Sequence, residues 1–299
     1  MDTRFLESFV EVSEHGSLAE AARRLGITPA AVAQRIRALE AELGCRLLTR
    51  AGRVVQPTEA GFAILARSRT FLREIRDLRT VAAAPATAGE LTVGAVSTAI
   101  TGLVPQILNE VIAEYPRVQV YIEPATSIEL YSKVLDGDLD AAILVQPRFP
   151  LPKTCELHTL RREALVLIAP ASVDSRDPYQ LLRTQPFVRY DRKHWGGRLA
   201  DNYLKTTGIV PAERFELDSL EAIAVMVDRG LGISLVPDWA PPWPAGLSLI
   251  KIPVAAAAYE RRIGLMSLRS SPRLRLIRAF TEAALRMTQP SPGPLTREA

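Results

Sequence analysis

The segment SLAEAARRLGITPAAVAQRIRALEAELG, residues 17–44, contains the start and stop signals of two consecutive helices. Ser17 precedes the first helix and Glu20 follows three positions later, which is the spacing of a capping box, and a glycine ends this helix. Thr28 is a suitable N-cap for the second helix, and Pro29 stands at its first position, where a missing N–H costs no hydrogen bond. Two capped helices joined by a short turn predict a helix-turn-helix.

The flanking segments predict one more helix before this motif and a small hairpin after it. Apolar residues recur at helical spacing over residues 5–10, and residues 45–58, CRLLTRAGRVVQPT, form two short extended pieces around a glycine. The hairpin would be a wing that carries Arg50 and Arg53. We therefore predict a winged helix domain of all-α type over residues 1–58.

Positive charge is concentrated in this same region. The net charge of the whole chain is only +4, but the segment between Arg23 and Arg53 has seven arginines against two glutamates. Such a cluster is typical of a DNA-binding surface, although a solvated helix face has the same composition. The arginines are Arg23, Arg24, Arg35, Arg37, Arg46, Arg50 and Arg53, and the glutamates are Glu40 and Glu42.

A long helix is expected after the wing. Thr58 is its N-cap, and we predict a linker helix over residues 59–82 that joins two subunits into a dimer, because its apolar stripe needs a partner. The stripe is expected along one side of the helix. Its residues are Phe62, Leu65, Phe71, Leu72, Ile75 and Leu78. Residues 83–90 break the pattern and are predicted to be a hinge.

Strand-like and helix-like segments alternate over the remainder of the chain. This alternation predicts an α/β domain with parallel-rich sheets over residues 91–288. Two blocks of the pattern indicate two lobes. We predict lobe 1 at about residues 91–160 and 255–288, lobe 2 at about 161–254, and a disordered tail at 289–299.

The N-terminal part resembles the signature of LysR-type transcriptional regulators. The resemblance is carried by FVEVSEHGSLAEAARRLGITPAAVAQRIRALEAELGCRLLTR, residues 9–50, and by PTEAG, residues 57–61. DGDLDAAI and VDRGLGISLVPD extend it along the chain. The resemblance implies a two-lobed sensor domain similar to periplasmic binding proteins, inverted-repeat sites on double-stranded DNA, and a dimer of dimers, that is, a homotetramer. RNA polymerase is left open as a further partner.

The segment departs from the family at the start of the recognition helix. Members commonly have Ser-Gln-Pro there and a serine near the middle, whereas this chain has Thr28, Pro29, Ala30 and Ala33. We expect fewer polar contacts to bases and more reading of DNA shape and methyl groups. The residues predicted to contact DNA are Ser17, Thr28, Pro29, Ala30, Ala31, Gln34, Arg35, Arg50 and Arg53.

The resemblance places the effector in the cleft between the two lobes, where loops follow the carboxyl ends of strands. The predicted effector-binding residues are Ser97, Thr98, Ala99, Thr126, Ser127, Gln146, Tyr190, Arg192, Trp195, Asp218 and Ser219. Their hydroxyl groups, with Arg192 or Arg198 as a clamp, suit a small carboxylate. The alternative is that Thr98, Ser127 and Ser219 are only helix caps.

Other classes of function have less support. The chain contains no GxGxxG, P-loop, HExxH or GxSxG motif and its three histidines are scattered, so we predict neither an enzyme, nor a cofactor, nor a metal site. A redox-sensing regulator of the same fold, switched through Cys45 and Cys155, is the main alternative. A solute-binding transport protein is a weaker one. The charged N-terminus and the lack of long apolar runs predict a cytoplasmic protein that does not enter a membrane.

Overall fold

The computed structural model describes residues 2–52, 54–83, 89–254 and 259–288. The chain divides into two units, Met1–Pro85 with Asp136–Asp138, and Ala86–Leu135 with Leu139–Ala299. Arg53, most of the predicted hinge and the predicted tail lie outside the described residues. No helix in the described ranges is long and apolar enough to cross a membrane.

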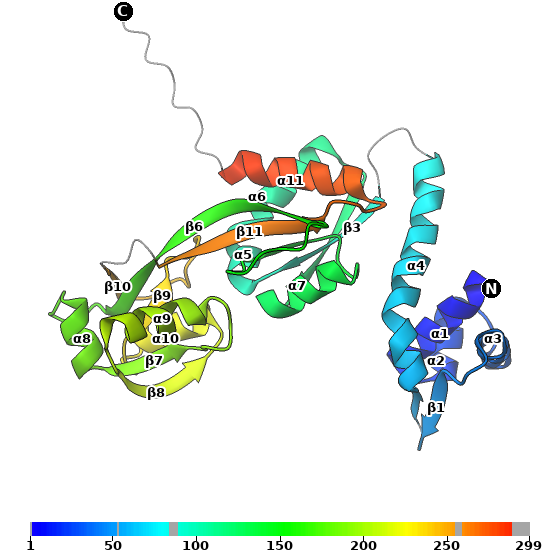
Figure 1. Ribbon diagram of the computed structural model, residues 1–299, viewed down its shortest axis with the longest axis horizontal. Helices are drawn as coiled ribbons and strands as arrows, with labels where there is room; N and C mark the ends of the chain where they lie inside the picture. Colours follow the sequence, from blue (N-terminus) through cyan, green and yellow to red (C-terminus); the bar gives the residue numbers. More distant parts are fainter. Residues whose placement is uncertain (1, 53, 84–88, 255–258, 289–299) are drawn as a thin grey trace, which may run out of the picture. The chain divides into compact units, whose positions relative to one another are not determined.

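The first unit confirms the predicted helices and wing (Figure 1). Its elements are α1 Thr3–His15, α2 Leu18–Leu25, α3 Pro29–Leu43, β1 Leu48–Ala51, β2 Val54–Pro57 and α4 Glu59–Ala83. The caps predicted from the sequence are present, since Thr28 Oγ1 accepts a hydrogen bond from Ala31 N at 3.2 Å and Thr58 Oγ1 accepts one from Gly61 N at 3.1 Å. Phe9, with Val32 and Leu39 of α3, lies in the core of this unit.

The predicted capping box of α2 is only half formed. Ser17 Oγ accepts a hydrogen bond from Glu20 N at 3.4 Å. The Glu20 carboxylate does not return to Ser17 but accepts hydrogen bonds from Arg23 and Arg24, at 3.0 Å and 3.2 Å from their Nε atoms. Two arginines one turn away therefore compete successfully for the carboxylate.

The wing is fixed to the turn between α1 and α2. Strands β1 and β2 pair antiparallel, and Val55 N donates a hydrogen bond to Gly16 O at 2.9 Å. Gly16 has a φ of +63°, and a Cβ at this position would lie 2.7 Å from a methyl carbon of Val54. Glycine is therefore needed both for the left-handed turn and for the close approach of the wing.

The apolar residues of α4 do not all lie on one side. Leu65 and Leu72 pack against the core of the first unit, while Phe62 and Phe71 are 65% and 44% exposed. Phe62 and Phe71 are nine residues apart, about two and a half helical turns, so they point to opposite sides. The predicted single stripe therefore cannot contain both Phe62 and Phe71, and the side chain of Leu78, also assigned to it, lies outside the described residues.

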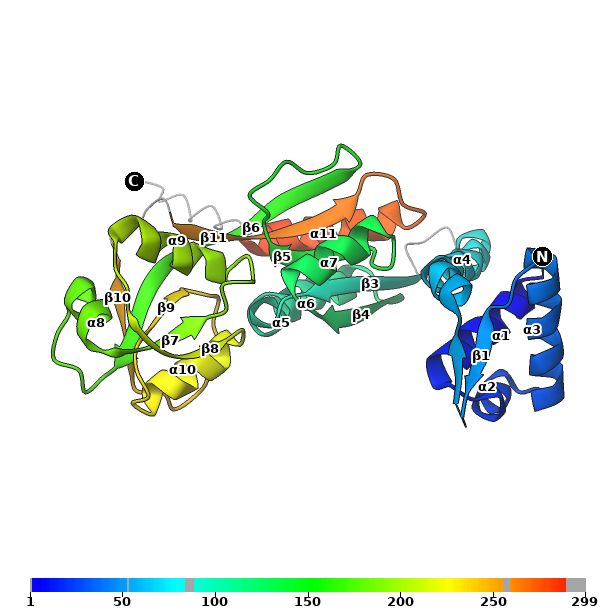
Figure 2. The same cartoon turned by 60° about the horizontal axis from the view of Figure 1, so that its bottom comes forward.

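The second unit has two lobes, as predicted (Figure 2). Lobe 1 contains β3 Gly89–Ala95, α5 Ser97–Gly102, α6 Val104–Glu114, β4 Val118–Pro124, α7 Ser127–Leu135, β5 Ala141–Val145 and α11 Leu274–Thr288. Lobe 2 contains α8 Pro178–Thr184, β7 Pro186–Tyr190, α9 Gly197–Thr207, β8 Ala212–Leu217, α10 Leu220–Asp228, β9 Ser234–Pro237 and β10 Leu249–Pro253. Both lobes share β6 Cys155–Pro170 and β11 Glu260–Leu268.

The sheets of this unit are mixed. Strand β3 pairs parallel with β4 and β5, and β7 pairs parallel with β8, in line with the predicted βαβ pattern. Strand β11 pairs antiparallel with β5 and β6, and β6 pairs antiparallel with β9 and β10. The long strands β6 and β11, green and orange in Figure 1, thus add antiparallel pairs to the predicted α/β architecture.

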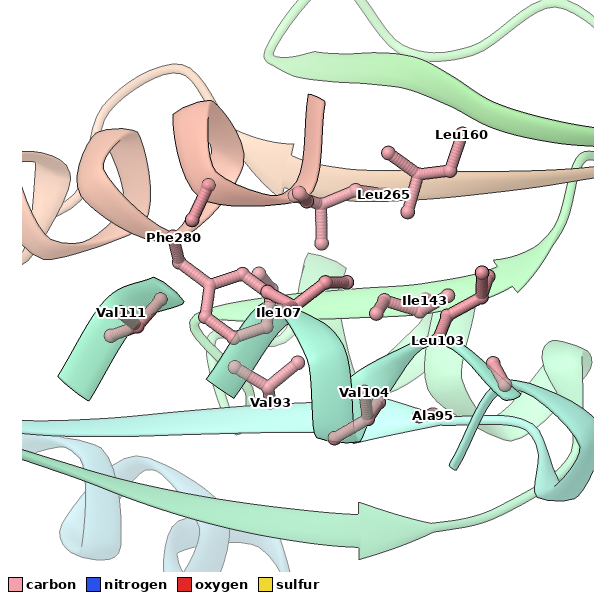
Figure 3. Packing of buried hydrophobic residues seen from close by; sticks show 14 of the residues in the cluster. Val93, Ala95, Leu103, Val104, Ile107, Val111, Ile143, Leu160, Leu265 and Phe280 are labelled. Atoms are coloured by element: carbon pink, nitrogen blue, oxygen red, sulfur yellow. The ribbon is translucent and has the colours of Figure 1, made fainter. Parts of the chain in front are cut away.

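Alternation along the strands gives each lobe a core on both faces of its sheet. In β5, Ile143 belongs to the core under α5, α6 and α11, and Leu144 belongs to the core under α7. Figure 3 shows the first of these cores, with Phe280 of α11 close to Ile107 of α6 and Val93 of β3. The carboxyl ends of β3, β4 and β5 are thereby held at one edge of lobe 1.

Strands β6 and β11 carry the chain between the lobes. Their register shifts between Ile263, which pairs with Arg161, and Gly264, which pairs with Thr159. Close to this irregularity Glu163 and Arg261 are cross-strand partners, and both side chains are only 2% exposed. A buried ion pair therefore lies where the two lobes meet.

Candidate functional site

The predicted DNA-binding face of α3 is accessible. Thr28, Pro29, Ala30 and Gln34 are exposed, and Ala31 and Arg35 are half-buried. Val32, Ile36 and Leu39, on the other side of the helix, are buried in the core. The helix therefore presents its first turns, which are the turns that enter the major groove in helix-turn-helix proteins. Most of what they present is methyl and methylene surface.

The remaining predicted DNA contacts differ in how they are placed. Arg50 is exposed on β1, and Ser17 is half-buried as the N-cap of α2. The hydrogen bonds that Glu20 accepts from Arg23 and Arg24 lower its pKa to about 2, so that all three side chains are charged and paired at neutral pH. Arg23 and Arg24 thus contribute less free positive charge than their number indicates.

Between the two lobes lies a cavity of about 280 Å³, here named the first cavity. It is formed at the carboxyl ends of β3, β4, β5, β7 and β8, as the sequence predicted for strand-end loops. Most of the predicted effector residues line it. These are Ser97, Thr98, Thr126, Ser127, Tyr190, Trp195 and Asp218.

Four predicted effector residues do not line the first cavity. Ala99 is 2% exposed and belongs to the core of lobe 1, and Ser219 caps α10 by accepting a hydrogen bond from Ala222 N at 3.2 Å. Gln146 lines a different cavity. Arg192 lies at the surface of lobe 2, where its Nε donates to Glu216 at 3.0 Å and its Nη2 donates to Glu213 at 2.5 Å.

The hydroxyl groups of the first cavity also hold the local fold together. Thr126 and Glu129 form a capping box at α7, in which Thr126 N and Oγ1 donate to the Glu129 carboxylate at 2.9 and 2.8 Å. Ser127 Oγ accepts a hydrogen bond from Val145 N at 3.1 Å. The Thr126 hydroxyl is therefore committed to Glu129, whereas the Ser127 hydroxyl hydrogen has no acceptor among the described residues and can serve a ligand.

Arg261 is a functional candidate that the sequence reading missed. Its guanidinium is buried at the floor of the first cavity, where Nε donates to Glu163 at 2.5 Å and Nη2 donates to Thr98 Oγ1 at 3.1 Å. Glu163 is 98 residues away along the chain. A local pattern could not reveal this pairing, because only the register of β6 against β11 brings the two side chains together.

Acidic side chains also line the first cavity, while Glu163 is already the counter-ion of Arg261. Glu129 and Asp218 both line the first cavity, and His194 Nε2 lies 3.8 Å from an Asp218 oxygen. Hydrogen bonds from the backbone and hydroxyl of Thr126 lower the pKa of Glu129, so that it is ionised at neutral pH. Burial raises the pKa of Tyr190, which therefore remains a neutral phenol. The first cavity thus offers both anionic and cationic groups to a ligand.

Trp195 is held against lobe 1 by the loop that carries it. Its ring makes edge contacts with Tyr131 and Phe149 at centroid distances of 5.8 and 5.6 Å. A Cβ at Gly197 would lie 1.9 Å from Asp191 O, and one at Gly196 would lie 2.8 Å from the Tyr190 ring. The glycine pair thus lets the loop fold tightly enough to place Trp195 in the cavity wall.

The two cysteines lie in separate units and in different environments. Cys45 is exposed in the first unit, whereas Cys155 is 4% exposed in an apolar cluster of lobe 1. No cluster of metal-ligating side chains occurs among the described residues. Cys155 is thus enclosed by apolar side chains and has the environment of a structural residue.

Two family models match the chain. The model described as "Bacterial regulatory helix-turn-helix protein, lysR family" matches residues 3–62, and the one described as "LysR substrate binding domain" matches residues 85–289. Among curated relatives, the HTH-type transcriptional regulator TtuA of Agrobacterium vitis is 29% identical over 86% of this chain and 91% of its own length. The hydrogen peroxide-inducible genes activator of Haemophilus influenzae is 29% identical over 80% of this chain and 81% of its own length.

Solved structures of the same architecture also match over nearly the full length. A full-length OxyR variant from Pseudomonas aeruginosa is 25% identical, with a TM-score of 0.71 and coverage of 95% of this chain and 94% of its own. Full-length CbnR in complex with its target DNA has a TM-score of 0.73 at 24% identity, covering 97% of this chain and all of CbnR, and supports the fold alone.

Proposed function

The chain belongs to the LysR family of DNA-binding transcriptional regulators, and from that premise we propose that a small molecule bound in the first cavity sets its activity at promoters. Its relatives are transcriptional regulators rather than enzymes, and regulators of this family bind DNA and form oligomers. We divide the chain into a DNA-binding domain at 1–58, a linker helix at 59–82, a hinge at 83–90 and an effector-binding domain at 91–288. Its place of action is the cytoplasm, where its DNA is, and RNA polymerase is a further proposed partner.

At the DNA, the exposed face of α3 would enter the major groove and the wing would contact the backbone. Thr28, Ala30 and Gln34 are exposed at the start of α3, and Arg50 is exposed on the wing. Two copies joined through α4 would read an inverted repeat. Ser17, Pro29, Ala31 and Arg35 complete the proposed interface, together with Arg53. A dimer of such dimers would give the homotetramer.

We assign to the effector a carboxylate and, in addition, a hydroxyl or amino group. The observation that carries this assignment is the mixture of hydrogen-bond donors and acceptors in the first cavity, where Arg261 and Ser127 can donate hydrogen bonds and Glu129 and Asp218 can only accept them. A simple carboxylate would satisfy the donors but would offer no hydrogen to the Glu129 and Asp218 carboxylates. Hydroxy acids and amino acids supply both kinds of group.

A thermal-shift screen of the full chain tests this assignment. Hydroxy acids and amino acids should raise the melting temperature, and plain carboxylates of the same length should raise it less. Ser97→Ala should weaken binding about three- to tenfold, because an exposed hydroxyl that faces the cavity is lost. Ser248→Ala is the matched control, because this serine is exposed, does not line the cavity and uses its hydroxyl in no hydrogen bond among the described residues. Stabilisation only by cations or neutral sugars, or equal effects of the two substitutions, would refute the assignment.

No observation of similar weight supports the alternative that the protein senses redox state through its cysteines. The relative from Haemophilus influenzae is named as peroxide-inducible, but that name applies to that protein. In this chain Cys155 is buried and Cys45 lies in the other unit, in the turn after α3. We therefore retain the small-molecule effector as the proposed signal. The N-terminal helix-turn-helix likewise argues against a solute-binding transport protein.

A further inference from the structure

A side chain of the recognition helix α3 reaches across to the wing. Glu40 is half-buried on α3, next to the buried Leu39. Its Oε1 atom accepts hydrogen bonds from Leu47 N at 2.8 Å and from Leu48 N at 3.2 Å. Leu48 is the first residue of β1, so the carboxylate of Glu40 meets the wing where its first strand begins.

The bond to Leu47 N satisfies a buried donor. Leu47 is fully buried in the core of the first unit, and no backbone carbonyl of the described residues accepts its N–H. A buried N–H without an acceptor is costly, and a carboxylate is a stronger acceptor than a neutral oxygen. Glu40 therefore holds this peptide in place, whereas an exposed glutamate would only be solvated.

The start of α4 holds the same short segment from its other side. Thr58 N donates a hydrogen bond to Leu47 O at 2.9 Å, and Thr58 Oγ1 donates one to Arg46 O at 2.7 Å. A Cβ at Gly61 would lie 2.2 Å from Leu47 O, so a glycine is needed for α4 to approach this closely. Leu47 is thus fixed between Glu40 and α4, which leaves this end of the wing little freedom.

The wing has a second attachment, which is made by the backbone. Val55 of β2 donates its N–H to Gly16 O at 2.9 Å, and Val55 is the cross-strand partner of Arg50. If β1 moved away from Glu40, the hairpin would pivot about the Gly16 contact and would carry the exposed Arg50 with it. A substitution of Glu40 therefore removes one attachment of the wing and leaves the other in place.

We propose that Glu40 is a positioning residue for DNA binding. It sets the wing relative to the recognition helix, so that Arg50 reaches the DNA backbone while α3 lies in the major groove. The proposal rests on the contact between the wing and DNA proposed above. Glu40 then acts on DNA binding in two opposite ways, because its charge repels the phosphates and its hydrogen bonds place the wing.

Two substitutions of Glu40 separate these effects. Glu40→Gln and Glu40→Ala both remove the charge, but only glutamine keeps an oxygen that can accept the two N–H groups. We expect Glu40→Gln to bind a mixed-sequence DNA duplex at least as tightly as the unchanged protein, and Glu40→Ala to bind it about three- to tenfold more weakly than Glu40→Gln. Glu40→Ala should also lower the slope of log K against log salt by about one unit, as the loss of one phosphate contact does. Fluorescence anisotropy of the full chain at several salt concentrations measures both.

Hydrogen exchange over residues 46–52 measures the wing directly. These amides should exchange faster in Glu40→Ala than in Glu40→Gln, while the amides of α1 keep their protection and show that the domain is folded. Glu40→Asp is a second variant, which keeps the charge but is one methylene too short, and it should lower the salt slope as Glu40→Ala does. Glu7→Ala is the control for charge and should leave the slope unchanged, because Glu7 is exposed on α1 and makes no hydrogen bond or ion pair with the described residues.

Three results would overturn the proposal. If Glu40→Ala binds DNA as tightly as Glu40→Gln and with the same slope, Glu40 is only a solvated charge. If Arg50→Ala lowers the slope and neither Glu40→Ala nor Glu40→Asp does, the wing contacts DNA without the help of Glu40. If the wing amides exchange faster in Glu40→Ala but neither this variant nor Arg50→Ala changes the slope, the wing does not contact DNA, and the proposed wing contact fails together with the role of Glu40.

Discussion

Glu163 and Arg261 face each other on β6 and β11, and each side chain is 2% exposed. Removing two charges from water costs several kcal/mol per ion, which their attraction repays only when the geometry is good and further hydrogen bonds are made. Here Arg261 also donates to Thr98 Oγ1. The pair is therefore costly to break, since either residue alone would be a buried, unpaired charge.

At the residue scale, we expect Glu163→Gln to lower the free energy of unfolding by about 3–5 kcal/mol, because Arg261 loses its counter-charge. Glu260→Gln is the matched control on the same pair of strands. The Glu260 side chain is 24% exposed, and its partner Arg162 is 64% exposed, so its loss should cost no more than about 1 kcal/mol. Urea unfolding of both variants measures the difference. If both variants lose the same free energy of unfolding, the buried Glu163–Arg261 pair is no more costly to break than the exposed pair.

At the scale of elements, α3 presents few polar side chains on the face predicted to meet DNA. Its first turns expose Thr28, Pro29 and Ala30, and Pro29 has no N–H to offer to a phosphate. Gln34 is the exposed side chain of this helix that can pair with an adenine. Arg50 lies on the wing, where contact with the DNA backbone positions the protein without reading sequence.

Because Gln34 is assigned to base contacts and Arg50 to the DNA backbone, their substitution should change DNA binding in two different ways. Arg50→Ala should weaken binding to all sequences alike and should lower the slope of log K against log salt by about one unit. Gln34→Ala should cost about 1–3 kcal/mol at one base position and should relax the sequence preference there. Binding titrations at several salt concentrations, with Arg278→Ala as the control for net charge, check both. A loss for Arg50→Ala confined to one base pair would contradict its assignment to the backbone.

Elements with local signals could be predicted from the sequence. Thr28 and Thr58 are N-caps in the structure because a cap depends on residues within one turn of it. Strand-end positions such as Ser97 and Ser127 also followed, since the carboxyl ends of parallel strands meet at one edge.

The sequence could not predict which acidic residue, far away along the chain, pairs with a given arginine. Arg192 and Arg261 are both arginines near strand ends, but Glu213 and Glu216 of β8 hold Arg192 at the surface, and Glu163 holds Arg261 inside. Each outcome depends on strand register rather than on the neighbouring sequence.

At the scale of the whole molecule, the core of the first unit covers only part of the apolar surface of α4. Leu65 and Leu72 are already used by the core of the first unit. Phe71 is 44% exposed, and Ile75, one turn further on, is half-buried. An apolar surface of this kind on a long helix is the usual basis of association between two copies.

We expect Phe71→Asp to raise the dissociation constant of the dimer at least about tenfold, because a charge would be buried in the interface. Phe62→Asp introduces the same charge and the same loss of helix propensity on the opposite side of α4, and should leave the dimer intact. Sedimentation velocity over a concentration series measures both. If Phe62→Asp dissociates the protein and Phe71→Asp does not, the interface lies on the other face.

The strands that link the lobes have a practical consequence. The chain enters lobe 2 along β6 and returns along β11, and the entry and exit points are adjacent, because Arg161 and Ile263 are cross-strand partners. Lobe 2 is therefore a cassette inserted at one place in lobe 1. Recombination that exchanged residues 162–262 for those of a relative would replace the part of the wall of the first cavity that lobe 2 and Arg261 provide, and would leave the helix-turn-helix unchanged. Such an exchange can change the effector to which a regulator responds, while the regulator continues to bind the same promoters.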